Sequence, residues 1–388
     1  MRMLRAFLLS LCLFPAARAE ELARAYNRFG FELLGQCRQS LPQTNFFLSP
    51  PGLGFALSMV QSGAKGETSR QMRTALRVEG FPAEALNGAN KELLASLAGV
   101  DAGIKLEIAN SLWLDKAAAL KPEFVADAKR AFDAEVDGAD FKDPATVNRI
   151  NEWAAVRTGG KIARMVQSPL DPLLRLIVLN AIYFKGDWTT PFDAKLTRDL
   201  PFAVGGAQTV NLPRMRRDGS FRYLEQDAFQ AVELPYSGGA VSMDVFLPKA
   251  GLDAFLGGLT AENFEQWTRQ MQSRKGALEL PRFKLENEYN LKAVLSAMGM
   301  PLAFTARADF SGISQESLQI SWVKQKTYVE VNEQGTEAAA VTGIGMRALA
   351  VRAQPPPFRM VVDRPFFVAI RERETGLILF LGAIFDPR

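Results

Sequence analysis

The sequence predicts an α+β fold built as a single domain. Apolar residues recur at helical spacing mainly in the first 160 residues, whereas runs rich in β-branched and aromatic residues dominate the remainder. This order differs from the repeating strand–helix units of a parallel α/β fold. No internal repeat and no flexible linker divides the 388 residues, so one large domain is the better interpretation.

The N-terminus has the three parts of a secretory signal peptide. Arg2 and Arg5 precede a short apolar stretch, and Ala17-Arg18-Ala19 forms a small-x-small cleavage site. We therefore predict a signal peptide over residues 1–19, a mature domain over 20–388, and a secreted or periplasmic location. Beyond the N-terminus no apolar run is long enough to span a membrane, so we predict no membrane contact.

Four helices are expected from periodicity and capping signals. The first covers 21–39, where apolar residues recur every three or four positions. Asp143-Pro144 has the pattern of an N-cap followed by proline in the first turn, and Gly159-Gly160 ends that helix. Two more are expected over 123–131 and 291–298.

Strands are predicted where β-branched and aromatic residues gather. The runs are 105–114, 174–184, 241–247, 277–283, 322–331, 358–362, 366–371 and 377–385. Two stretches, 173–179 and 377–381, are almost continuously apolar, as expected for central strands that are buried on both faces.

The charge balance does not favour nucleic-acid binding. Residues 1–19 contain three arginines and no acidic residue, so their removal lowers the formal net charge from +4 to +1. Nucleic-acid binding needs a concentrated basic face, and we predict none. Arg214, Arg216 and Arg217 form a local basic cluster, which we interpret as a solvated turn, with a heparin site as the alternative.

Several kinds of catalytic site are excluded by composition. The chain contains no histidine, which excludes Ser-His-Asp triads and H-E-x-x-H zinc sites. Cys37 is the only cysteine of the predicted mature chain, so neither an internal disulfide nor a thiolate metal site can form. Ser62 and Lys65 match an S-x-x-K pattern, which we interpret as a helix-ending Ser-Gly turn. We therefore predict no enzyme activity, no metal and no cofactor.

A segment near the C-terminus combines the properties of a loop with those of a strand. It follows the strand-like run 322–331 and consists of small residues, Gly335-Thr336-Glu337-Ala338-Ala339-Ala340. Because strand side chains alternate between two faces, Thr336, Ala338 and Ala340 share one face with no charged residue. Glu337 falls on the other face. The segment could therefore be buried as a central strand.

This segment resembles the hinge of the reactive loop of an inhibitory serpin, a serine protease inhibitor. The blocks 45–50, 180–188, 329–333 and 363–366 resemble further parts of that family, in the family's order and spacing. The resemblance implies a single serpin domain with a large central β-sheet, additional sheets, eight or nine helices and an exposed reactive loop at about 333–357. The absence of N-x-S/T sequons fits a bacterial source.

The resemblance also implies a function, namely irreversible suicide inhibition of a serine protease by a monomer. In the family, the protease cleaves the loop, and the loop then enters the central sheet while the acyl-enzyme is trapped. Counting from Gly335 places the cleaved bond at Leu349–Ala350, with Ala348, Ala350 or Arg347 as alternatives for the residue before the bond. Leucine before the bond suits a chymotrypsin- or cathepsin G-like target, and the alanine alternatives suit an elastase-like one. The alternative is a non-inhibitory serpin that acts as a carrier or chaperone.

The family's shutter and breach, where the central sheet opens, imply a second set of site residues. The matching positions here are Ser49, Asn180, Gln325, Trp188, Glu333 and Arg282. Two positions depart from the family pattern, because Gly52 replaces a usual serine and Gln325 replaces a usual histidine. Glu333 is expected to pair with Arg282.

Overall fold

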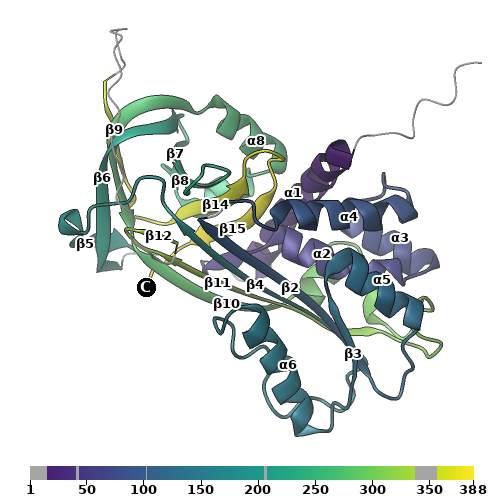
Figure 1. Cartoon of the computed structure of the whole chain (residues 1–388). Coiled ribbons are helices and arrows are strands. Elements are labelled where there is room, and N and C mark those ends of the chain that lie inside the picture. The colour runs from purple at the N-terminus through teal and green to yellow at the C-terminus, as the bar shows by residue number, and fades with distance from the viewer. Residues whose placement is uncertain (1–14, 41–42, 102, 205–207, 337–355) are drawn as a thin grey trace, which may run out of the picture.

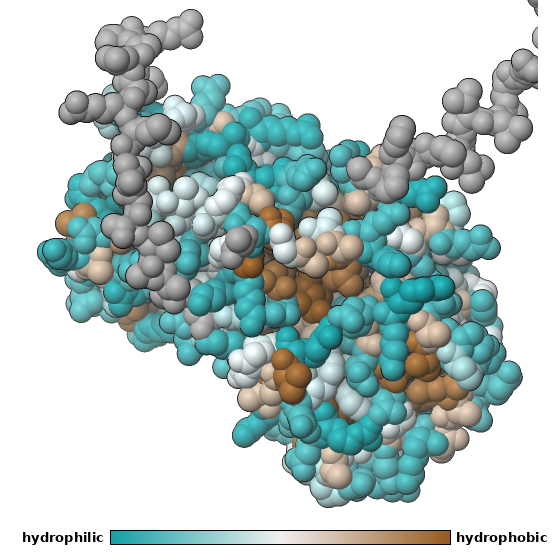
Figure 2. Space-filling view, viewed as in Figure 1, coloured by the Kyte–Doolittle hydropathy of each residue, from teal (hydrophilic) through white to brown (hydrophobic). Residues whose placement is uncertain are grey.

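The computed structural model describes residues 15–40, 43–101, 103–204, 208–336 and 356–388. A cluster of helices packs beside two β-sheets that share one large hydrophobic core (Figure 1). Figure 2 shows that hydrophilic residues cover most of the same face, with hydrophobic residues gathered near its middle.

Nine α-helices and two short 3-10 helices lie within the described residues. The α-helices are α1 (Pro15–Ser40), α2 (Pro50–Ser62), α3 (Gly66–Ala75), α4 (Ala83–Leu97), α5 (Pro122–Phe132), α6 (Pro144–Arg157), α7 (Leu252–Gly257), α8 (Ala261–Gln270) and α9 (Lys292–Ala297). The 3-10 helices are η1 (Ala194–Leu196) and η2 (Pro301–Phe304).

The first sheet has six strands and contains the start of the predicted loop. Its order is β10 (Phe283–Asn290), β11 (Ile320–Val331), β12 (Gly335–Thr336), β4 (Leu176–Asp187), β2 (Ile104–Asp115) and β3 (Glu135–Ala139). Strands β11 and β4 also pair directly and run parallel, with Gln325 opposite Asn180.

The second sheet has nine strands and closes the core on the other side. Its order is β1 (Phe46–Leu48), β15 (Ile378–Ile384), β14 (Phe366–Glu372), β8 (Val241–Pro248), β7 (Phe229–Pro235), β6 (Thr209–Glu225), β9 (Gln272–Pro281) and β13 (Phe358–Val361), and β5 (Arg198–Ala203) pairs with β6.

Helices cover both faces of the six-stranded sheet. Helix α2 contacts β4 and β15, and almost every residue in it is buried. Helix α6 lies on the opposite face (Figure 1). Its residues Val147, Ile150 and Ala154 belong to a second hydrophobic cluster. The side chains of β4 alternate between these two clusters, which explains why the sequence of β4 is apolar at nearly every position.

The structure confirms the α+β class and most of the expected elements. The predicted 21–39 helix lies within α1, and the Asp143 carboxylate caps α6 by accepting a hydrogen bond of 2.9 Å from the Ala145 amide. Ser62 ends α2 and Gly63 is its C-cap, as the turn interpretation of the S-x-x-K match requires. Helices α3, α4, α7 and α8 and strands β1, β3, β5 to β7 and nearly all of β10 were not anticipated from the sequence.

Two sequence-based interpretations were wrong. The run 277–283 is not one strand, because β9 ends at Pro281 and pairs with β6, whereas β10 begins at Phe283 in the other sheet. Arg214, Arg216 and Arg217 do not form a turn, because they lie within the long strand β6. Arg214 and Arg216 share one face of the strand and Arg217 lies on the other, so the three side chains do not form one surface cluster.

Residues 1–14 of the predicted signal peptide lie outside the described residues. The remaining residues of that segment, 15–19, form the beginning of α1, and Ala19 is buried.

We predict that Asp143→Ala lowers the free energy of unfolding by about 1 kcal/mol, because the Ala145 amide loses its capping acceptor. Urea unfolding followed by circular dichroism measures the change. Asp143→Ser, which retains a capping oxygen, should stay close to wild type, and equal stability of all three proteins would contradict the capping role.

Candidate functional site

The first two residues of the predicted hinge occupy a position between two central strands. Gly335 and Thr336 form β12, which pairs antiparallel with β4 through Asp187 and Gly186 and antiparallel with β11 through Val331. Farther along, β4 and β11 pair directly with each other. The hinge thus enters the sheet at the point where β4 and β11 begin to separate.

Backbone hydrogen bonds hold the turn that connects β11 to β12. The Asn332 amide donates to the Gly335 carbonyl at 2.9 Å, and the Trp188 amide donates to the Gln334 carbonyl at 2.8 Å. The indole N–H of Trp188 donates to the Asn332 carbonyl at 3.0 Å. Trp188 therefore ties the turn to the end of β4 through both its backbone and its side chain.

Thr336 is buried against an aromatic pair. Its hydroxyl lies 2.7 Å from the Tyr236 hydroxyl, and the Tyr236 ring stacks on Trp188 with centroids 4.5 Å apart. Burial raises the pKa of Tyr236, so the phenol stays neutral. The inward position of Thr336 agrees with the alternation expected from the sequence.

Gly335 is required by the close approach of β4. A Cβ atom at this position would lie 2.2 Å from the Gly186 carbonyl oxygen and 2.6 Å from the Asp187 Cα. Both contacts are with backbone, which cannot move aside as a flexible side chain would. A glycine at the head of the hinge is therefore a packing requirement.

Glu333 and Arg282 are in contact at the edge of this turn. Both Nε and a terminal nitrogen of Arg282 donate to Glu333 Oε1, at 2.8 and 2.6 Å, and Thr197 donates to the same oxygen. Burial by itself would raise the pKa of Glu333, but these hydrogen bonds hold it below its usual value. The Arg282 side chain is 44% exposed, so solvent screens the pair.

A buried set of polar side chains joins β4 to β11 farther along. Gln325 Nε2 donates to Asn180 Oδ1 at 2.7 Å and to the Ser49 carbonyl at 2.9 Å. Its Oε1 accepts from the Ser49 amide at 2.9 Å, and Asn180 donates to Asn110 Oδ1 at 2.8 Å. One glutamine thus bridges β11, β4 and the start of α2.

The two departures from the family pattern are structurally linked. A Cβ atom on Gly52 would lie 2.6 Å from Asn180 Oδ1, which is the atom that accepts from Gln325. The Asn180 amide therefore occupies space that a serine at position 52 would need. Glycine at 52 permits the amide placement on which the Gln325 bridge depends.

The described residues contain no metal-binding group and no membrane-length helix. They include no cluster of three or more Cys, Asp or Glu side chains placed to hold a metal ion. No helix among them is long and apolar enough to cross a bilayer. Burial raises the pKa of Cys37 to about 12, which keeps this thiol protonated and unreactive at neutral pH.

The structure brings the predicted site residues together as two groups. Glu333, Arg282 and Trp188 surround the turn before the hinge, and Ser49, Asn180 and Gln325 meet between β4, β11 and α2. Glu337, Ala338, Ala339, Ala340, Leu349 and Ala350 lie outside the described residues. Sequence reasoning missed Tyr236, Thr197 and Asn110, because no local motif marks residues that reach the site from distant parts of the chain.

A protein-family model described as serpin (serine protease inhibitor) matches residues 24–387. The chain belongs to the serpin family. It is 36% identical to Iripin-2 of Ixodes ricinus, with 99% of this chain and 98% of the relative covered. It is also 36% identical to the leukocyte elastase inhibitor of Bos taurus, with 95% of this chain and 100% of the relative covered.

Several solved structures have the same fold as this serpin. Human thyroxine-binding globulin in complex with thyroxine superposes with a TM-score of 0.87 at 28% identity, covering 96% of this serpin and all of that chain. Native protease nexin-1 with heparin gives a TM-score of 0.85 at 28% identity, and the match covers 95% of this serpin and 100% of that chain. The matching family model describes a serine protease inhibitor and not an enzyme.

We predict that Gln325→Leu lowers the free energy of unfolding by about 3 kcal/mol, because the Ser49 amide and the side-chain Oδ1 of Asn180 lose their partner in a buried site. Urea unfolding measures the loss. Gln39→Leu makes the same chemical change at an exposed position of α1 and should leave stability close to wild type. A Gln325→Leu protein as stable as Gln39→Leu would refute the bridging role.

Proposed function

We propose that this serpin is an irreversible inhibitor of an extracellular serine protease with chymotrypsin-, cathepsin G- or elastase-like specificity. The protease cleaves the reactive loop at Leu349–Ala350 and forms an acyl-enzyme. The loop from Thr336 onward then enters the six-stranded sheet between β4 and β11 and traps the covalent complex. The signal-peptide pattern supports secretion or export to the periplasm, and a monomer suffices for this mechanism.

The position of β12 is the main observation that supports inhibition by loop insertion. The hinge already lies between β4 and β11 and runs antiparallel to both, so insertion extends a strand whose first two residues are in place. Two new ladders would replace the single ladder between the parallel strands. If about ten additional hydrogen bonds contribute around 1 kcal/mol each, insertion gains on the order of 10 kcal/mol.

The chemistry of the hinge supports insertion as well. Thr336 is fully buried, and the residues predicted to share its face, Ala338 and Ala340, are small and uncharged. A charged residue on this face would cost several kcal/mol on burial. Among the relatives, the leukocyte elastase inhibitor is named as an inhibitor, whereas thyroxine-binding globulin is named for a hormone, so a non-inhibitory carrier is the alternative to test.

We predict a covalent complex with chymotrypsin that survives denaturing gel electrophoresis. Thr336→Arg should abolish this complex and convert the serpin into a cleaved substrate, because the guanidinium would have to be buried beside Tyr236. Glu337→Arg, on the face predicted to point outward, is the matched control and should retain the complex. Cleavage of the wild-type loop without any complex would contradict inhibition and favour the carrier alternative.

We also predict the position of the cleaved bond. The fragment released from the chymotrypsin complex should begin at Ala350 and end at Arg388, as determined by N-terminal sequencing and mass spectrometry. Fragments that begin at Leu349, Val351 or Ala348, from cleavage after Ala348, Ala350 or Arg347, would move the bond out of the predicted register. Such a result would change the inserted length without affecting the proposal of inhibition.

A further inference from the structure

A small polar pocket lies between β6, β7 and β9, outside the groups of residues described above. It has a volume of about 250 Å³, and its lining includes Arg217, Arg222, Arg373, Ser220 and Ser273. Ligand pockets usually enclose about 300–1,000 Å³, so this pocket suits a small ligand.

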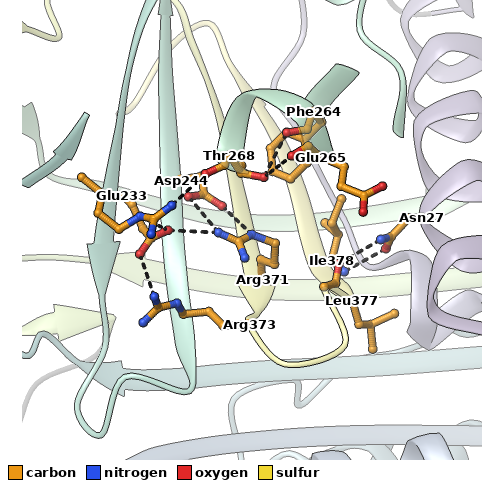
Figure 3. Close-up of polar contacts among 12 residues, drawn as sticks. Asn27, Glu233, Asp244, Phe264, Glu265, Thr268, Arg371, Arg373, Leu377 and Ile378 are labelled. Atoms are coloured by element: carbon orange, nitrogen blue, oxygen red, sulfur yellow. Dashed lines mark hydrogen bonds and ion pairs between the residues drawn. The ribbon is translucent and has the colours of Figure 1, made fainter. Parts of the chain in front are cut away.

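One buried carboxylate, that of Glu233, is shared by three guanidinium groups. Arg371 lies 3.1 Å from Glu233 Oε2, Arg222 Nε lies 3.4 Å from the same oxygen, and Arg373 lies 3.6 Å from Oε1. Arg371 also contacts Asp244 at 3.0 Å. Figure 3 shows Arg371 between Asp244 and Glu233, with Arg373 on the other side of Glu233.

The arginines exceed what these carboxylates can neutralise. Arg222 Nε is buried and makes no hydrogen bond, because its contact with Glu233 lacks the geometry of one. Burial raises the pKa of Asp244, although Arg371 acts in the opposite direction. A terminal nitrogen of Arg222 donates to the Thr268 carbonyl at 2.9 Å, which leaves the charge of this guanidinium only partly balanced by the shared Glu233 carboxylate.

Arg217 adds a further cation without an acidic partner among the described residues. Its guanidinium lies over the rings of Phe192 and Phe221, with centroid distances of 5.2 and 4.5 Å, and donates to the Thr190 carbonyl. Burial lowers the pKa of Arg217 to about 10, so the side chain is still charged at neutral pH.

We infer that this pocket binds a small tetrahedral dianion, sulfate or hydrogen phosphate, between Arg217, Arg222 and Arg373. Among the described residues that meet here, four guanidiniums face two carboxylates, an excess of two positive charges that a dianion neutralises. Guanidinium groups donate paired hydrogen bonds to such oxyanions, and the hydroxyls of Ser220 and Ser273 supply further donors.

Two segments that line the pocket also lead to a residue that contacts the hinge. Its lining includes Thr190 and Pro235, and Pro235 precedes Tyr236, whose hydroxyl contacts Thr336. The Thr189 amide donates to the Pro235 carbonyl at 3.0 Å, which joins the two segments. An anion bound there would hold these segments together next to the hinge.

Isothermal titration calorimetry on the full chain tests the inference. Potassium phosphate and sodium sulfate are titrated separately at pH 7.5 in 150 mM NaCl, and saturable 1:1 binding of at least one is expected. Arg217→Met and Arg222→Gln should each weaken binding about tenfold or more, a factor that corresponds to about 1.4 kcal/mol. Arg217→Lys keeps the charge and should weaken binding less than Arg217→Met.

Arg216→Met is the matched control. Arg216 lies on the same strand as Arg217 but on its other face, is 48% exposed and pairs with Asp218, so binding should be unchanged. Circular dichroism shows whether each variant is folded. If Arg217→Met does not fold, the binding measurement relies on Arg222→Gln. The inference fails if neither anion binds wild type, if the pocket variants bind like wild type, or if succinate, a dianion of different shape, binds as tightly.

Discussion

The parallel pairing of β4 with β11 is the constraint on which the rest of the structure depends. Each backbone N–H and C=O in a buried sheet needs a partner, and these two strands supply one ladder to each other along most of their length. At one end β12 separates them and pairs with both. If β12 were longer, it would pair with both β4 and β11, and two ladders of hydrogen bonds would replace the one between these strands. The native sheet can therefore still gain backbone hydrogen bonds.

Two different kinds of contact hold the strands in this arrangement. Gln325, Asn180 and Ser49 form a buried, uncharged network, and breaking it leaves desolvated groups that cost about 1–3 kcal/mol each. The Arg282–Glu333 pair is half exposed on the arginine side, and such pairs contribute about 0–1 kcal/mol. The amide network therefore contributes more to holding β4 and β11 together. Because neither Gln nor Asn titrates, the strength of this network does not change between pH 5 and 8, whereas a histidine would change its charge in that range.

Local signals predicted the regular elements, and packing between distant segments assembled the site. The caps of α6 and α2, the first helix and the apolar central strands follow from residues that are neighbours in the chain. The residues that surround the hinge do not follow from their neighbours in the chain. Tyr236 reaches Thr336 across 100 positions, and Thr197 reaches Glu333 across 136. The run 277–283 was misassigned for the same reason, since only the pairing partners decide that β9 and β10 belong to different sheets.

The sequence by itself determined the α+β class, the serpin resemblance and the two-sided character of the hinge, because helix and strand periodicity and small-residue composition are local properties. It also identified Gly52 and Gln325 as departures from the family pattern. Only the tertiary structure decided that these departures are linked through Asn180, and that Gly335 must lack a Cβ because β4 approaches it. It likewise placed the arginines of β6 on opposite faces, since distances between segments far apart in the chain are set by packing.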